Sequence, residues 1–103
     1  MKLPVIFWTN EAIHSLNSCV EFLESVWDEK IIEKFLDLID EKIDLISSNP
    51  EIGSKVFSTN NRKLLIHENV SLYYKVDNSQ LKILLIWDNR QDPKKLLRDL
   101  KKI

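Results

Sequence analysis

The hydrophobic pattern of this chain changes its period once, and this change limits the folds that the chain can adopt. Between Ile13 and Ile46, apolar residues recur every three or four positions, which is typical of amphipathic helices. From Arg62 to Trp87, apolar and polar residues largely alternate, which is typical of half-buried strands. Helices followed by a run of strands predict an α+β domain, with the helices packed on one face of a largely antiparallel sheet.

A first strand and two helices are expected in the first half of the chain. Residues 3–8 (LPVIFW) predict the strand, and Asn10 is the expected N-cap of the helix that follows. Asp28 is expected to cap a second helix, which should end before Pro50 because proline disfavours helical geometry in the residue before it. The short break near Asp28 predicts an antiparallel helical hairpin.

The apolar stripe of the second helix is expected to face the sheet. Leu36 and Ile39 both belong to this stripe, and we expect both side chains to lie in the core between the hairpin and the sheet. The stripe of the first helix is expected to extend to Trp27.

Three strands joined by short polar turns are expected in the second half, at residues 62–67, 70–76 and 81–87. Tight turns make them an antiparallel meander that completes one sheet with the N-terminal strand. The last of the three is apolar on both faces, which favours a central position in the sheet. Residues 93–102 are expected to form either a short terminal helix or a loose basic tail.

Strict alternation predicts that Tyr73, Leu84 and Ile86 share the sheet face that points away from the helices. That face is then too apolar to be bare, because soluble proteins rarely expose a large apolar patch. A partner is expected to cover it.

Length and composition exclude several classes of protein. The 103 residues are enough for one domain, expected to span residues 1–103. One cysteine excludes an internal disulfide, and His14 and His67 have no ligand at metal-binding spacing, so neither a metal nor a cofactor is expected. No apolar stretch approaches the ~18 residues that span a bilayer. No membrane association is expected, and a cytoplasmic location follows by default.

The net charge of −1 hides an asymmetry between the two halves of the chain. Residues 10–47 carry ten acids and three bases, whereas residues 54–103 carry eleven bases and five acids. An asymmetry of this kind either indicates an anionic partner for the C-terminal half or is a coincidence of solvated faces.

Basic residues stand at the ends of the predicted strands. Arg62 and Lys63 open one strand, His67 ends it, and Arg90 and Lys94 follow the last strand. If these side chains converge, they form a phosphate-binding patch suited to nucleic acid or to an acidic peptide. If they do not converge, they are ordinary solvated charges. The choice depends on the order of strand pairing, which stays open here.

Nearly the whole chain also carries a family resemblance. An acidic helical hairpin leads to "NPEIG" and then to "RKLLIHENVSLYYKVDNSQLKILLIWDNRQDPKKL". Over nearly its whole length, this sequence resembles the RelE/ParE superfamily of bacterial toxins from type II toxin–antitoxin modules, which include plasmid stabilisation proteins. The resemblance implies a small cytoplasmic toxin that inhibits growth. It also implies a cognate antitoxin that wraps the toxin with an extended C-terminal segment in a hetero-oligomer.

The resemblance implies two different targets. RelE-like members cut mRNA in the ribosome with Lys and Arg on the middle strands, an Arg after the last strand and often a C-terminal Tyr. Arg62 or Lys63 matches the first of these and Arg90 the last, but Ser71 stands where RelE has an Arg, and no Tyr follows Arg90. These departures favour the ParE-like members, which poison DNA gyrase.

Two alternatives remain, so whether the chain is an enzyme stays open. One is a ribosome-dependent mRNA endonuclease with a rearranged site built on Arg62, Lys63, His67 and Arg90, in which His67 shuttles protons. The other is an inactive relative that only binds its antitoxin. The side chains expected to contact the target or the antitoxin are Arg62, Lys63, Tyr73, Leu84, Ile86, Arg90 and Lys94.

Arg90 is the residue on which the resemblance bears most directly. It is expected at the rim of the concave sheet face, held in place by Asp88, by Asp92 or by the turn that Pro93 closes. It either contacts the target or only braces this turn, and the two roles are compatible.

Overall fold

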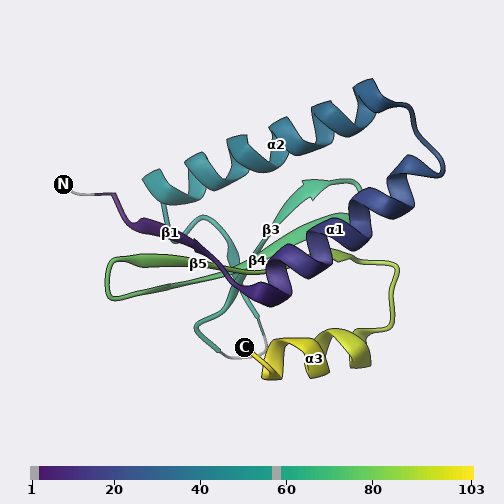
Figure 1. The fold of residues 1–103 in the computed structure, drawn as a ribbon. Helices are drawn as coiled ribbons and strands as arrows, with labels where there is room; N and C mark the ends of the chain where they lie inside the picture. Colours follow the sequence, from purple (N-terminus) through teal and green to yellow (C-terminus); the bar gives the residue numbers. More distant parts are fainter. Residues whose placement is uncertain (1–2, 57–58) are drawn as a thin grey trace.

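The computed structural model describes residues 3–56 and 59–103 and has the expected α+β architecture (Figure 1). The long helix α2 runs back over the sheet in the direction opposite to α1, which confirms the helical hairpin (Figure 1). The elements in chain order are β1 (Val5–Trp8), α1 (Asn10–Glu24), α2 (Glu29–Ser48), β2 (Ser54–Lys55), β3 (Arg62–His67), β4 (Val70–Asp77), β5 (Gln80–Asp88) and α3 (Pro93–Lys101).

The strands form one mixed sheet in the order β1-β5-β4-β3-β2. β3, β4 and β5 are the expected antiparallel meander. β1 pairs with β5 in parallel, so β5 lies inside the sheet, as its apolar character on both faces predicts. β2 has only two residues, which is too short for any periodicity, and the sequence gives no sign of it.

The start of α1 lies one residue earlier than expected, because Thr9 and not Asn10 is the N-cap. The Thr9 hydroxyl oxygen accepts a hydrogen bond from the N–H of Ala12 at 3.1 Å. The same hydroxyl donates to the carbonyl of Ile83 at 2.9 Å, so the cap also ties the helix to β5. Asn10 is exposed and is the first residue of the helix.

The second helix begins and ends where the sequence predicts. The Asp28 carboxylate accepts a hydrogen bond from the N–H of Ile31 at 3.1 Å, which is the expected N-cap. α2 ends at Ser48, just before the Asn49–Pro50 pair. α1 ends at Glu24, so Trp27 lies in the connection between the helices and not on the helical stripe.

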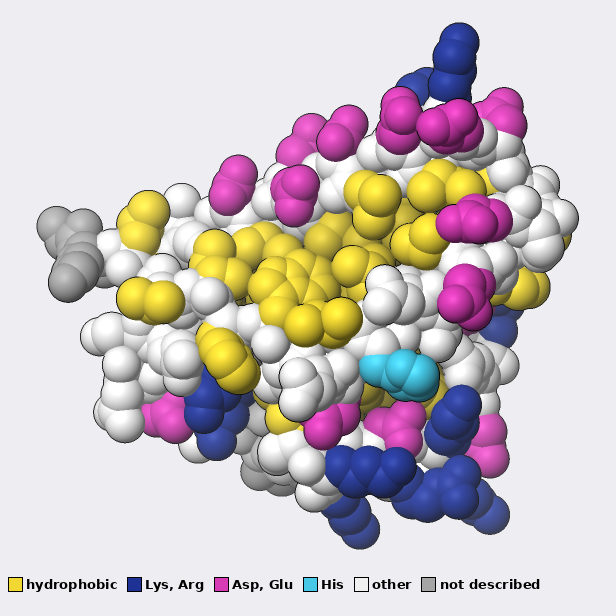
Figure 2. Space-filling view, in the orientation of Figure 1, with side chains coloured by type: hydrophobic (Ala, Val, Ile, Leu, Met, Phe, Trp, Pro, Cys, Tyr) yellow, Lys and Arg dark blue, Asp and Glu magenta, His cyan; other side chains and the backbone are white. Residues whose placement is uncertain are grey.

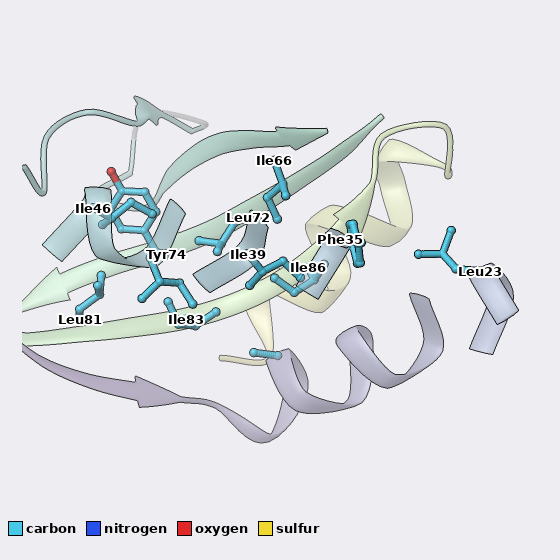
Figure 3. Packing of buried hydrophobic residues seen from close by; sticks show 12 residues of the cluster. Leu23, Phe35, Ile39, Ile46, Ile66, Leu72, Tyr74, Leu81, Ile83 and Ile86 are labelled. Carbon is cyan, nitrogen blue, oxygen red and sulfur yellow. The ribbon is translucent and has the colours of Figure 1, made fainter. Parts of the chain in front are cut away.

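The larger core lies between the helical hairpin and the sheet (Figure 3). Ile39 is 2% exposed, as the stripe predicts, whereas Leu36 is 37% exposed, so the expected core position of Leu36 is wrong. One residue turns a helix by about 100°, so Leu36 rotates away from the packed face that Phe35 occupies. The core side chains labelled in Figure 3 are Leu23, Phe35, Ile39, Ile46, Ile66, Leu72, Tyr74, Leu81, Ile83 and Ile86.

A smaller core lies on the opposite face of the sheet, under α3. Tyr73 is 2% exposed and Leu84 is 3% exposed, and Leu96 and Leu100 of α3 belong to the same cluster. The expected exposure of Tyr73 and Leu84 is therefore wrong, because the C-terminal segment forms a helix that covers them. Of the two alternatives for this segment, the terminal helix is correct.

A β-bulge places Ile86 on the helical face. Leu85 pairs with Tyr73, but the next pair along β4 skips Leu84. One extra residue inverts the alternation of side chains beyond it. Leu84 and Leu85 therefore both join the smaller core, while Ile86 is 1% exposed in the larger one. The expectation that Ile86 is exposed and shares a face with Leu84 is wrong for this reason.

Candidate functional site

The strand register separates the basic residues that the sequence singles out. β3 and β5 run in the same direction on either side of β4. Arg62 lies in the row of Ile83, whereas His67 lies in the row of Asp88, two residues before Arg90. At ~3.3 Å per residue, these two rows are about 16 Å apart along the strands. The basic residues do not converge on one patch.

Arg62 is engaged with the backbone of the loop before β2. Its Nη1 donates to the carbonyl of Gly53 at 2.6 Å and to that of Glu51 at 3.2 Å. Tyr74 closes the same loop, because its hydroxyl donates to the carbonyl of Pro50 at 2.8 Å and accepts from the N–H of Gly53 at 2.9 Å. Arg62 therefore holds this loop against the sheet.

Arg90 forms a two-pronged ion pair with Asp88 where β5 ends. Its Nε lies 3.0 Å from Asp88 Oδ1, and its Nη2 lies 2.7 Å from Oδ2. The hydrogen bond from Arg90 holds the pKa of the Asp88 carboxyl below its usual range. The expected bracing by Asp88 is confirmed. Asp92 has a different role, since it caps α3 by accepting from the N–H of Lys94 at 2.9 Å.

His67 and Arg90 border a cavity of about 320 Å³ beside the connection between α1 and α2. The rings of His67 and Trp27 pack in a T-shaped arrangement, with ring centroids 6.1 Å apart and an interplanar angle of 74°. Much of the wall is apolar, and Glu68 and Asp88 add carboxylates. This cavity unites two residues of the expected catalytic set.

Cys19 lies in the same wall and does not have the character of a nucleophile. Burial, with a smaller contribution from Asp88, raises the pKa of the Cys19 thiol. The thiol therefore stays protonated at neutral pH, and Cys19 packs as a small, partly buried side chain against the larger core.

Lys63 lies on the other face of the sheet and borders a different cavity, of about 420 Å³, between the sheet and the first turn of α3. Tyr73 lines it too, together with Lys55 and Trp87, which the sequence analysis did not select. Lys55 sits in a segment without periodicity, so no sequence signal marks it. Lys94 is exposed in the first turn of α3 and does not line this cavity.

Ser71 occupies the position where RelE-like toxins carry an arginine. It is 2% exposed, and its hydroxyl oxygen accepts a hydrogen bond from Asn89 Nδ2 at 2.8 Å. The backbone N–H of Asn89 donates to the carbonyl of Asn69 at 2.6 Å, which ties the end of β5 to the turn before β4. Asn89 therefore has a structural role that the sequence did not reveal. Because the serine side chain is uncharged, Ser71 cannot replace the arginine as a cation at this position of the sheet.

Residues 3–56 and 59–103 contain neither a cluster of metal-ligating side chains nor a helix that could span a membrane. Within these ranges, no three His, Cys, Asp or Glu side chains gather as metal ligands. No helix in this part of the chain is long and apolar enough to cross a bilayer.

The family of the chain follows from its sequence. Residues 6–93 match the model of a family described as the ParE toxin of the type II toxin–antitoxin system parDE. The chain belongs to this family. It is a ParE-like toxin of a type II toxin–antitoxin module, in agreement with the resemblance noted from the strands and the "RQDP" segment. No curated protein sequence matches the chain.

Two solved structures share the fold of this ParE-family toxin. A chain of the chromosomal ParDE toxin–antitoxin system from P. aeruginosa has a TM-score of 0.72 and 19% identity, covering 84% of this chain and 96% of that chain. A conserved hypothetical protein from Helicobacter pylori has a TM-score of 0.57 and 15% identity, covering 86% of this chain and 98% of that one. At these identities the likeness concerns the fold alone.

Proposed function

We propose that this toxin acts by binding and inhibiting DNA gyrase and not by cleaving mRNA. The supporting observation is the dispersal of the expected catalytic residues. Arg62 holds a loop, Lys63 faces the α3 side of the sheet, and His67 and Arg90 border a third region. Cleavage of RNA needs cations and a proton shuttle around one phosphodiester. Among the described residues, His67 and Arg90 border one cavity, but neither Arg62 nor Lys63 joins them there. That cavity therefore lacks a second cation of the expected set.

Gyrase is the proposed target because the chain belongs to the ParE family, whose members are expected from the resemblance to poison this enzyme. An inactive relative that only binds its antitoxin is the remaining alternative. It differs from the proposal in one measurable respect, since it leaves gyrase unaffected.

The test uses the purified full chain with gyrase, relaxed plasmid and ATP. We expect supercoiling to fall and cleaved DNA to accumulate as the toxin is added, while mRNA in a parallel translation reaction stays intact. New mRNA ends together with unimpaired supercoiling would overturn the proposal in favour of the endonuclease. No effect in either reaction would favour the inactive relative.

We also propose that a cognate antitoxin covers the hydrophobic band between α2 and the β1–α1 segment. Figure 2 shows this band as continuous hydrophobic surface. Exposed apolar side chains on the three elements include Ile6, Ile13 and Leu36. The sheet face first expected to need a partner is covered by α3, so the open surface between the helices is the better candidate.

An antitoxin that also carries acidic residues would complement the basic C-terminal half of the toxin. Complementary charges speed association, and salt weakens this effect. We expect Ile13→Asp to weaken antitoxin binding. Ser18→Asp, also exposed on α1 but about 140° around the helix from Ile13, serves as the matched control. Equal affinities for the two variants would argue against this surface.

A further inference from the structure

The two edge strands of the sheet differ in length and in charge. β2 forms one edge and has two residues, one of which is Lys55. β1 forms the other edge, and the segment from Leu3 to Asn10 that contains it has no charged side chain. Soluble proteins normally protect a sheet edge with short strands and charged side chains, because an open edge pairs with other strands. β1 therefore lacks the charge that protects β2.

The side chains of β1 are exposed on both faces of the sheet. Ile6 pairs with Leu81 and shares its face, which is the hairpin face, whereas Val5 and Phe7 point to the opposite face. The exposed fractions are 42% for Ile6, 48% for Phe7 and 65% for Val5. An uncharged apolar strand that lies at an edge and is exposed on both faces is typical of a surface that pairs with another strand.

The backbone of β1 has free hydrogen-bonding groups in a fixed order. The N–H groups of Val5 and Thr9 donate to backbone carbonyls on the β5 side, at 2.9 and 3.2 Å. The direction of these groups alternates along a strand, so the N–H and C=O of Ile6 and Trp8 point away from β5. Among the described residues, no turn, loop or helix cap pairs with these outward groups.

The order of the outward groups is self-complementary about Phe7. If two β1 strands pair in antiparallel fashion with Phe7 at the centre, Ile6 of each copy faces Trp8 of the other. Facing residues of this kind exchange two hydrogen bonds, so the N–H and C=O of both residues are satisfied in both copies. A pair centred on Ile6 would set Trp8 against Pro4, which has no N–H, and would leave the Trp8 carbonyl unpaired.

We propose that two copies of this toxin associate through β1, with the strands antiparallel and centred on Phe7, so that the two sheets join into one. The contact is isologous, because the same edge serves both copies. An uncharged strand suits an uncharged partner strand and gains no attraction from the acidic antitoxin segment expected for the basic half of the toxin. β1 has four residues, so the interface is small and the dimer is weak and dependent on concentration.

This contact is distinct from the proposed action on gyrase and does not depend on it. A monomeric toxin that inhibits gyrase would overturn only the present proposal, and a dimer without effect on gyrase would overturn only the gyrase proposal. Ile6 also belongs to the hydrophobic band proposed for the antitoxin, so a second copy and the antitoxin compete for it.

The first test is sedimentation velocity of the purified full chain without antitoxin, from roughly 10 μM to roughly 1 mM, the range that a weak contact requires. We expect the dimer fraction to rise with concentration. A chain that stays monomeric over this range would overturn the proposal and would leave the β1 edge to the antitoxin.

Two variants of Ile6 test whether the backbone makes the contact. Ile6→Pro removes an N–H that points away from β5, so it costs no hydrogen bond within the sheet. We expect it to raise the dissociation constant of the dimer by about tenfold or more, because its N–H is lost from both copies. Ile6→Ala keeps the N–H and shortens the same side chain, so its effect should be clearly smaller. Equal effects would contradict pairing through the backbone.

Hydrogen exchange of the unmodified chain gives a readout that needs no variant. Amide protection measured by NMR should rise with protein concentration at Ile6 and Trp8, whose N–H groups become bonded only in the dimer. Protection at Val5, which already donates to the β5 side, should change much less. No concentration dependence at Ile6 and Trp8, or the same change at all three residues, would overturn the proposed register.

Disulfide trapping locates the centre of the contact. In a Cys19→Ala background, Phe7→Cys sets two thiols opposite each other with Cα atoms about 4.5 Å apart, which a disulfide can bridge. Val5→Cys is the matched control on the same face, because its two copies lie about 13 Å apart along the strands. We expect oxidation to crosslink Phe7→Cys and to leave Val5→Cys largely monomeric. Equal or faster crosslinking of Val5→Cys would overturn the proposal.

Discussion

The two faces of the sheet are covered in different ways. The hairpin face lies under α1 and α2, of 15 and 20 residues, and twelve of the described side chains are buried in its cluster. The opposite face lies under α3, of nine residues, and seven of the described side chains are buried in its cluster. Buried apolar area is the main source of stability, so the hairpin face should carry most of the folding free energy.

Neighbouring tyrosines of β4 show how the two faces differ. The Tyr74 hydroxyl on the hairpin face makes two hydrogen bonds that close the loop before β2. Tyr73 on the opposite face belongs to the smaller core and borders a cavity of about 420 Å³ next to α3. The hairpin face is therefore fixed to its loop through a core side chain, whereas the α3 face leaves space beside its core.

The largest effect is expected from a truncation in the hairpin core. Ile39→Ala removes a side chain that is 2% exposed and should lower the free energy of unfolding by about 2–5 kcal/mol. Leu36→Ala on the same helix is the control. Its side chain is 37% exposed, so its loss should be about 1 kcal/mol or less. Urea unfolding measures both, and similar losses would show that the packed face of α2 is wrongly placed.

A smaller loss is expected from Gly53→Ala, which tests how tightly the loop before β2 is held against the hairpin face. An added Cβ would lie 2.7 Å from the carbonyl oxygen of Lys63 and 2.7 Å from the hydroxyl of Tyr74. The loop must then move away and strain its bonds to Tyr74 and Arg62, at a cost of about 1–3 kcal/mol. Ser54→Ala, at the next residue and exposed, is the control. A neutral Gly53→Ala in thermal unfolding would mean that this loop is free to shift.

Leu96→Ala tests the α3 face directly. Leu96 is 7% exposed and is one of two α3 leucines in the smaller core. We expect a global loss of about 1–2 kcal/mol, because α3 can undock before the rest of the domain unfolds. Hydrogen exchange should show faster opening of α3 with little change in α2. Equal acceleration in both helices would mean that the two faces unfold as one unit.

The sequence predicts the hairpin face better than the α3 face, and the periodicity explains why. α2 is long, and its three- and four-residue spacing correctly predicts Ile39 as core, although the same stripe also included Leu36, which lies at its exposed edge. Side chains along β5 stop alternating between the two faces at Leu84, where a β-bulge inserts one extra residue. The bulge is set by packing and cannot be predicted from the spacing of apolar residues. This single extra residue explains the wrong face for Ile86.

The candidate site was predictable only in part. The residue types were visible in the sequence, but their grouping depends on strand register, which a sequence does not reveal. Lys63 and Arg62 are adjacent in sequence but lie on opposite faces of the sheet, while Lys55 pairs with Arg62 through a two-residue strand. The ion pair between Arg90 and Asp88 was predictable because its partners are two residues apart.

The smallest effect on stability is expected for Arg90, whose side chain is 61% exposed. Arg90→Ala should leave the thermal midpoint nearly unchanged at neutral pH, because exposed ion pairs contribute little. The bond from Arg90 lowers the pKa of Asp88, so its contribution is present above the unfolded Asp pKa of about 3.9 and is lost as the pH falls through the lower, folded value. The stability curves of the wild type and the variant should therefore converge in acid. A difference that grows in acid would contradict this assignment.

The same substitution separates bracing from target contact. If Arg90 contacts the target, Arg90→Ala should reduce growth inhibition far more than its thermal midpoint falls. Arg90→Lys keeps the positive charge but loses the planar guanidinium group, which can form two parallel hydrogen bonds. A Lys variant that is stable but does not inhibit growth would show that the guanidinium geometry is needed. Asp88→Asn keeps Arg90 but removes its carboxylate partner, so loss of toxicity in this variant would show that Asp88 positions the guanidinium. If Arg90→Ala is fully toxic and fully stable, Arg90 has no direct role in toxicity, and the segment after β5 only connects this strand to α3.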